Sequence, residues 1–173
     1  MEISVRPGGP DDVQAVLALL DGATEWLVAQ GRTDQWGTDP HSTSPRRIAQ
    51  ISGFAATDGS LWIAEYDGRP VGALAVGDAH PPVPAAEEPE VYVRLLVTDR
   101  RSTGQGIGGV LLDHARDLAQ RAGVQVVRVD CFGGNDGALI RYYESQGFTR
   151  DVAFSVQREN APDWPGQVLV QRL

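Results

Sequence analysis

The spacing of apolar residues in the first third of the chain predicts a short strand followed by two helices. Residues 3–5 alternate as in a strand, and residues 10–12, Pro-Asp-Asp, are a typical helix start. Apolar residues then recur at helical spacing, in the set Val13, Val16, Leu17, Leu20, Trp26 and Leu27. A polar segment covers 32–45, and a second short helix is expected over 46–51.

The middle of the chain has the pattern of strands. Residues 61–66 and 71–76 predict a hairpin, because the Asp67-Gly68 pair between them favours a tight turn. Residues 90–97 are almost continuously apolar, which is typical of a strand buried on both faces. A glycine-rich turn over 103–109 follows this strand.

The last third predicts two more helices and three strands. The first helix has one apolar side, formed by Ile107, Leu111, His114, Ala115 and Leu118. It ends near Gly123, and a strand (124–129), a helix (137–145) and two strands (152–157 and 167–173) follow. Strands and helices in this order indicate a mixed α/β layer fold and not a regular βα alternation.

Length and composition favour one globular domain. The chain has 173 residues, 42% hydrophobic and 22% charged, and a domain usually has about 100–200 residues. We therefore expect a single domain over 1–173. No apolar run approaches the roughly 20 residues of a membrane span, and no signal peptide is visible, so we expect a cytoplasmic protein without membrane contact. The single cysteine, Cys131, excludes an internal disulfide and a Cys-rich zinc module, and no histidine pair has metal-ligand spacing, so we expect no metal.

The charges of the chain are unbalanced. Lys and Arg together occupy 15 positions, all of them arginine, against 23 Asp and Glu, so the formal net charge is −8. An acidic chain without a basic tract is a poor nucleic-acid binder, and we expect no nucleic-acid partner. A cationic small molecule suits this charge better.

The glycine-rich turn carries the pattern Gly104-x-Gly106-x-x-Gly109 before a helix. Glycines allow close approach of a ligand to the backbone, and a helix N-terminus presents free N–H groups, so a phosphate site is expected. A P-loop is excluded because it requires a lysine. A dinucleotide-binding turn stays open as an alternative, with Asp130 in the place of a ribose-binding acid, although residues 98–103 separate the turn from its strand.

Three blocks of sequence together point to a known family. The first is Leu95-Leu96-Val97, the turn over 104–108 and Leu111-Leu112; the second is Asn135, Ala138, Tyr143-Glu144 and Gly147-Phe148; the third is the hairpin over 61–76. Through them the chain resembles the GNAT acyltransferase superfamily, whose members transfer an acetyl group from acetyl-CoA to an amine. The resemblance covers most of residues 2–155. It implies a mixed, mostly antiparallel sheet of about six to seven strands flanked by about four helices.

The resemblance also implies which residues hold acetyl-CoA. The pantetheine would lie along the backbone of the buried strand, and the pyrophosphate would bind the glycine turn. The implied cofactor-binding residues are Leu95, Leu96, Val97, Thr103, Gly104, Gln105, Gly106, Ile107, Gly108, Gly109 and Asn135. Thr103 stands where the family has Arg or Gln, and Arg100 and Arg101 are further candidates for phosphate contacts. The alternative interpretation of Asn135 is a helix cap.

Acetyl transfer to an amine needs a proton donor, which the resemblance implies, and a base, for which strand position and alternation give a candidate. Tyr143 would protonate the leaving thiolate, with Tyr142 as the alternative because the spacing from Asn135 fits it better. Glu90, at the start of the buried strand, is the candidate general base. Asp78, His80 or a water molecule are alternatives. Cys131 is not expected to be a nucleophile.

The acceptor would lie among the first helices, the polar segment after them and the segment over 81–89. Trp26 and Trp36 are the candidate substrate-binding residues, with Gln35 and His41 beside them. The acidic surplus favours a small cationic primary amine that attacks acetyl-CoA directly in a ternary complex. A non-catalytic acyl-CoA-binding module and a protein-directed acetyltransferase stay open as alternatives. The resemblance is also compatible with a homodimer.

Overall fold

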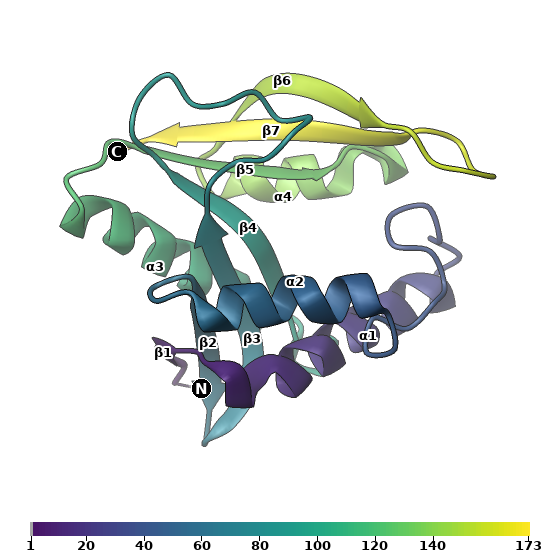
Figure 1. The fold of residues 1–173 in the computed structure, drawn as a ribbon, viewed down its shortest axis with the longest axis horizontal. Coiled ribbons are helices and arrows are strands. Elements are labelled where there is room, and N and C mark those ends of the chain that lie inside the picture. The colour runs from purple at the N-terminus through teal and green to yellow at the C-terminus, as the bar shows by residue number, and fades with distance from the viewer. Residues whose placement is uncertain (1) are drawn as a thin grey trace. The chain divides into compact units, whose positions relative to one another are not determined.

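The computed structural model describes residues 2–173, which form a seven-stranded sheet with helices (Figure 1). The strands are β1 (Ser4–Pro7), β2 (Leu61–Tyr66), β3 (Arg69–Gly77), β4 (Val91–Thr98), β5 (Val126–Phe132), β6 (Thr149–Val156) and β7 (Trp164–Arg172). The α-helices are α1 (Val13–Ala29), α2 (Pro45–Ala56), α3 (Ile107–Arg121) and α4 (Ala138–Ser145). Short 3-10 turns are η1 (Pro10–Asp12), η2 (Arg100–Ser102) and η3 (Asn135–Gly137). This order of elements confirms the α/β fold expected from the sequence.

The strand order in the sheet is β1-β2-β3-β4-β5-β7-β6. β1 pairs with β2, β2 with β3, β5 with β7 and β7 with β6 in antiparallel fashion, whereas β4 and β5 are parallel. The sheet is therefore mixed and mostly antiparallel. A dinucleotide-binding fold needs a mainly parallel sheet built from βαβ units, so this topology excludes the dinucleotide alternative.

The chain divides into two compact units. Of the described residues, the first unit contains 2–76 and 95–114, and the second contains 77–94 and 115–173. β4 and α3 each contribute to both units.

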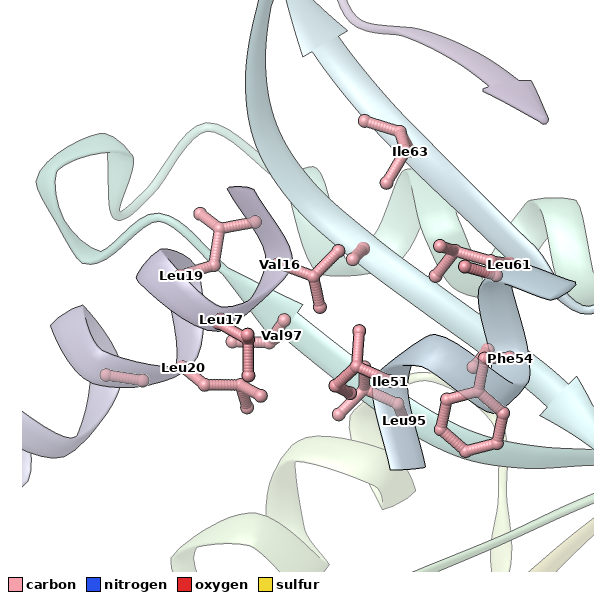
Figure 2. Close-up of a cluster of buried hydrophobic side chains, with 14 residues drawn as sticks. Val16, Leu17, Leu19, Leu20, Ile51, Phe54, Leu61, Ile63, Leu95 and Val97 are labelled. Atoms are coloured by element: carbon pink, nitrogen blue, oxygen red, sulfur yellow. The ribbon is translucent and has the colours of Figure 1, made fainter. Parts of the chain in front are cut away.

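In the first unit, α1 and α2 bury their apolar sides against β2, β3 and the second half of β4 (Figure 2). The buried side chains of this core include Val16, Leu17, Leu20, Ile51, Phe54, Leu61, Ile63, Leu95 and Val97. Ser44 begins α2 by accepting a hydrogen bond from the Arg47 N–H at 3.2 Å. The predicted end of this helix at 51 was too early, because Phe54 and Ala55 continue the buried side to Ala56.

The start of α3 packs directly on β3 at Gly72. A Cβ atom at Gly72 would lie 2.8 Å from Cγ2 of Ile107 and 3.0 Å from Cδ1 of Leu111. There is no room for a side chain at this position. Because glycine has none, the first turn of α3 can approach β3 closely. This contact fixes the position of the glycine-rich turn that precedes α3.

In the second unit, β5, β7 and β6 lie side by side, with α4 packed against them (Figure 1). A small core of Val83, Tyr92 and Val168 includes part of the Phe154 side chain. β6 and β7 begin at Thr149 and Trp164, earlier than the predicted starts at 152 and 167. β6 is an edge strand with mostly exposed side chains, so it has little apolar alternation that a pattern could detect.

Candidate active site

The glycine-rich turn before α3 is exposed and has an unusual backbone. Gly104 and Gly106 have φ values of +86° and +74°, in the left-handed region that favours glycine. A Cβ atom built at either position meets nothing within 4 Å. The glycines are therefore required by the backbone conformation, and the space beside them is open to a ligand.

The first turn of α3 supplies hydrogen-bond donors to this space. The N–H of Val110 donates to the carbonyl of Gly106 at 3.0 Å, which is the first bond of the helix. The N–H groups of Ile107, Gly108 and Gly109 precede this bond and have no carbonyl of the same helix to reach. Free N–H groups and the positive end of the helix dipole suit a phosphate. The Ile107 side chain is buried, so its backbone alone is available to a ligand.

The 3-10 turn η2 positions the glycine-rich turn. The buried carboxylate of Asp99 accepts hydrogen bonds from the backbone N–H of Arg101 at 3.0 Å and from its Nε at 3.1 Å. Burial alone would raise the pKa of Asp99, but the hydrogen bonds from Arg101 outweigh it and lower the pKa. The Thr103 hydroxyl donates to the Arg100 carbonyl at 2.6 Å. Thr103 and Arg101 thus stabilise the turn itself.

Arg100 and Trp26 lie together. The Arg100 guanidinium carbon is 3.7 Å from the centre of the Trp26 ring, a cation–π contact between η2 and α1. Burial lowers the pKa of Arg100. One face of Trp26, a predicted acceptor residue, is therefore covered by an arginine.

Trp36, the other predicted acceptor residue, lies in a different contact. Its ring meets His41 edge-on at 5.4 Å, and both residues line a hollow of about 180 Å³ with Asp39 and Arg47. Part of the Trp36 ring also packs against the α1–α2 core. Trp36 therefore contributes to the packing of the core, and its role in acceptor binding stays a prediction.

The strand predicted to bind the pantetheine, β4, has little exposed side-chain surface over residues 95–97. Leu95 and Val97 are buried in the α1–α2 core, and Leu96 is half-buried. Any contribution to cofactor binding from Leu95 and Val97 must come from their backbone.

Tyr143 is buried in the second unit, on the inner side of α4. Its ring meets Tyr142 edge-on at 5.2 Å and Phe148 at 5.8 Å. Burial raises the pKa of Tyr143 well above its usual value, and burial also raises that of Tyr142. Both phenols are therefore protonated at neutral pH and are able to donate a proton, and the geometry leaves the choice between them open.

The backbone conformation of Asn135 does not match that of a helix-capping residue. It lies within η3 at φ +55°, and the residues preceding the two helical segments are Gly134 for η3 and Gly137 for α4. The interpretation of Asn135 as a helix cap is wrong, because glycines occupy both cap positions. Its predicted contact with the cofactor stays a prediction.

Glu90 is held in an ion pair with Arg128. Nη2 of Arg128 lies 2.8 Å from Oε1 of Glu90, and Nε of Arg128 bonds the other carboxylate oxygen. The two side chains are 10% and 8% exposed, so Glu90 is not a solvated strand end. Nη2 of Arg128 also donates to the Pro84 carbonyl at 3.0 Å, which anchors the 81–89 segment. The alternatives for the base, Asp78 and His80, are exposed.

A second polar pair on the same strands was missed at the sequence level. The Tyr92 hydroxyl donates to the carboxylate of Asp130, and Tyr92 is buried whereas Asp130 is half-buried. Tyr92 pairs with Arg128 in the parallel ladder, so Asp130, two residues beyond Arg128, lies on the same face. The alternation of β4 and β5 was visible in the sequence, but their parallel register was not.

Cys131 is buried, and burial raises its pKa to about 12. It carries no thiolate at neutral pH, in line with the expectation that it is not a nucleophile. In the part of the chain that the structure describes, no group of three or more His, Cys, Asp or Glu side chains could hold a metal ion. None of the helices within residues 2–173 has the length and apolar character needed to cross a membrane.

Comparison with known proteins identifies the family. The profile of the Acetyltransferase (GNAT) family matches residues 20–148. The chain therefore belongs to the GNAT acetyltransferase family and is an acetyltransferase that uses acetyl-CoA. No curated protein matches the sequence.

Solved structures share the fold over nearly the whole chain. A ribosomal-protein-alanine N-acetyltransferase from Brucella melitensis has a TM-score of 0.72 and 22% identity, covering 98% of this chain and 99% of its own. The acetyltransferase yncA from Salmonella typhimurium, solved with its cofactor acetyl-CoA, has a TM-score of 0.70 and 19% identity, covering 99% and 94%. An agmatine N-acetyltransferase mutant has a TM-score of 0.70 and 16% identity, covering 100% of both chains. At these identities the likeness shows the fold alone.

Proposed function

We propose that residues 1–173 act as one acyl-CoA N-acyltransferase-like domain in the cytoplasm. It would transfer an acetyl group from acetyl-CoA to the primary amine of a small cationic molecule, by direct attack in a ternary complex. The observation that carries the proposal is the open glycine turn before α3, where the first N–H groups of the helix are free to bind a pyrophosphate.

The cofactor is assigned to two sets of backbone groups. The pyrophosphate would bind the N–H groups over 103–109, with a local attraction that overcomes the net charge of −8. The pantetheine would bind the backbone over 95–97 and the side chain of Asn135. The open space beside Gly104 and Gly106 supports this assignment.

The reaction needs a proton to leave the acceptor amine and a proton to reach the leaving thiolate of CoA. The acceptor ammonium loses one proton to water, and its nitrogen bonds the thioester carbon. As the carbon–sulfur bond breaks, the nitrogen loses a second proton, which balances the proton that the thiolate takes up. We assign the proton that the thiolate receives to Tyr143, with Tyr142 as the alternative. The raised pKa of Tyr143 supports a protonated donor.

The ion pair of Glu90 with Arg128 bears on its predicted role as the general base. Both of its oxygens accept hydrogen bonds from Arg128, so Glu90 would act as a base only after leaving this ion pair. We propose that Glu90 positions Arg128 and the 81–89 segment, and that water accepts the proton from the amine.

The acceptor class rests on charge. The acidic surplus favours a cation, and a structural neighbour is an agmatine N-acetyltransferase, an enzyme named for a small cationic amine. Another neighbour is named for a ribosomal protein. A protein acceptor is therefore a second outcome to test, together with a non-catalytic acyl-CoA-binding module. Trp26 and Trp36 are retained as acceptor contacts, and a homodimer is compatible with the proposal.

Two measurements test the function. Calorimetric titration with acetyl-CoA should show binding, whereas titration with NAD should show none. A panel of small amines and peptides with acetyl-CoA, read by release of free CoA thiol and by product mass, should show acetylation of small cationic amines. Acetylation of peptides alone would favour the protein-directed enzyme. Binding of acetyl-CoA without any transfer would favour the binding module.

A further inference from the structure

One face of the second unit combines a carboxylate with aromatic rings. Asp130 on β5 is bonded to Tyr92 on β4, and its partner across the ladder on β7 is Val168. Tyr92, Val168 and Phe154 belong to one small core. The carboxylate therefore lies next to a small apolar cluster on one side and the Arg128–Glu90 ion pair on the same face.

On this face Asp130 accepts a hydrogen bond from Tyr92 and lies next to the ion pair of Arg128 with Glu90. Burial, and then the nearby charge of Asp130, raise the pKa of Tyr92, so the phenol keeps its proton and donates it to the carboxylate. The neighbouring arginine, Arg128, is already neutralised by Glu90. Arg94 follows Tyr92 by two residues on β4 and so lies on the same face, where its Nη1 donates to the Asp78 carbonyl at 3.2 Å. A half-buried carboxylate bonded to a neutral phenol attracts a cation.

Aromatic rings lie next to this carboxylate on the same face. The Phe132 ring is 5.5 Å from the Trp164 ring, and Phe154 is 6.2 Å from Trp164. Phe132 follows Asp130 by two residues, so the two side chains share a face of β5. The Phe154 ring lies directly over Gly166, where a Cβ atom would be 2.2 Å from its Cζ. Phe154 and Trp164 are half-buried and so keep some accessible ring surface.

From this arrangement we propose that Asp130, positioned by Tyr92, binds the ammonium group of the acceptor, and that Phe154 and Trp164, in place of Trp26 and Trp36, contact its apolar body. The acceptor is then a primary ammonium carried on an aromatic or alkyl group. This inference rests on the proposed function for its biological meaning, but the binding itself does not require acetyl-CoA.

The chemistry of the site separates this class from others. An ammonium donates a charge-assisted hydrogen bond to Asp130 and gains cation–π attraction from the nearby rings. An acceptor with a carboxylate beside its amine would bring a like charge towards Asp130, which is unfavourable. A polyamine gains from the first contact but leaves its further charges beside apolar rings.

The test uses the full chain and three probes: 2-phenylethylamine, n-butylamine and L-phenylalanine. In calorimetry without acetyl-CoA, 2-phenylethylamine should bind most tightly, n-butylamine less tightly and L-phenylalanine least tightly. Asp130→Asn keeps an acceptor for the Tyr92 hydroxyl and removes the charge. It should weaken 2-phenylethylamine binding by about 10- to 100-fold. Asp117→Asn is the matched control, because it removes one carboxylate from an exposed pair with Arg121 on α3 and should leave binding unchanged.

Two further variants separate positioning from contact. Tyr92→Phe leaves the Asp130 charge but removes its hydrogen bond, and should weaken binding of both amines equally. Phe154→Leu keeps an apolar side chain but removes the ring, and should weaken 2-phenylethylamine more than n-butylamine, because only the former loses a ring–ring contact. Urea unfolding of each variant confirms that the fold is retained.

The outcomes distinguish this inference from the proposed function. Equal binding of 2-phenylethylamine by Asp130→Asn and by the unchanged protein, or no binding of either amine, overturns the inference even if acetyl-CoA binds. Loss of amine binding in Asp130→Asn supports the inference even if acetyl-CoA does not bind, in which case the proposed transfer fails alone. If transfer occurs, Asp130→Asn should raise KM for the amine and leave KM for acetyl-CoA unchanged.

Discussion

The guanidinium of Arg128 holds both carboxylate oxygens of Glu90 within the second unit, where each side chain is about nine-tenths buried. A buried ion pair is costly to break by removing one partner, because the other charge then lies unpaired in the protein. The contribution of this ion pair can therefore be measured as a change in the free energy of unfolding.

Glu90→Ala is expected to lower the free energy of unfolding by about 3–5 kcal/mol, measured by urea denaturation. Glu88→Ala is the control, because Glu88 pairs with Arg172 at 2.6 Å on the surface, with side chains 43% and 69% exposed. Its loss should cost less than about 1 kcal/mol. A Glu90→Ala protein with full stability but no turnover would instead support Glu90 as the base.

Gly106→Ala is expected to weaken acetyl-CoA binding by about tenfold, because its methyl group would enter the open space beside the turn to which the pyrophosphate is assigned. The left-handed backbone at φ +74° should also cost about 1 kcal/mol of stability. Calorimetry and urea unfolding measure the two effects.

Gly53→Ala is the control for this substitution. Gly53 lies inside α2, and a Cβ atom there meets nothing within 4 Å. Alanine in a helix should raise stability by about 0.5–1 kcal/mol and leave acetyl-CoA binding unchanged. Similar losses of binding in both variants would contradict a role for the turn.

Tyr143→Phe is expected to lower kcat by about 10²- to 10⁴-fold, since proton donation to a leaving group contributes an effect of this size. The affinity for acetyl-CoA should change little, because the ring and its packing against Phe148 are retained. Tyr142→Phe is the matched comparison on the same helix. If Tyr142→Phe shows the large loss of kcat and Tyr143→Phe does not, the proton donor is Tyr142.

His41 should make stability depend on pH. It is buried between Thr24, which lies 2.7 Å from Nε2, and Arg47, whose Nε donates to Nδ1 at 3.1 Å. Burial and then the charge of Arg47 lower the pKa of His41 below its usual 6.5, although Asp21 opposes this effect. The folded protein thus favours the neutral ring.

The sign of the effect follows from proton uptake. Below pH 6.5 the unfolded chain binds a proton that the folded chain does not, so stability is full above this pH and falls as the pH drops towards the lowered pKa. Urea midpoints between about pH 5 and 8 should show this fall. His41→Gln should reduce the slope, whereas His80→Gln, at an exposed position, should keep it. Equal slopes in the two variants would show that His41 does not cause it.

The elements and the glycine turn were predictable because local patterns define them. The apolar periodicity of α1, the Asp67-Gly68 turn and the glycines before α3 all act within a few residues. The ends of α2, β6 and β7 were placed less well, because burial of Phe54 and pairing at the sheet edge depend on distant residues.

The polar contacts of Glu90 and Tyr92 could not be predicted, because their partners are distant in the sequence. Arg128 lies 38 positions after Glu90, and Asp130 lies 38 positions after Tyr92. Both contacts exist because β4 and β5 pair in one parallel register. A shift of that register by one residue would turn Arg128 and Asp130 to the opposite face of the sheet.

The buried position of Cys131 makes this protein convenient for its own assay. With the pKa of its one thiol raised to about 12, the native chain should stay silent towards an aromatic disulfide reagent that reports free CoA. No cysteine needs to be replaced before turnover is followed. The same thiol becomes reactive when β5 unfolds locally. The rate of its labelling in the absence of substrate therefore measures the local unfolding of the strand that carries Asp130.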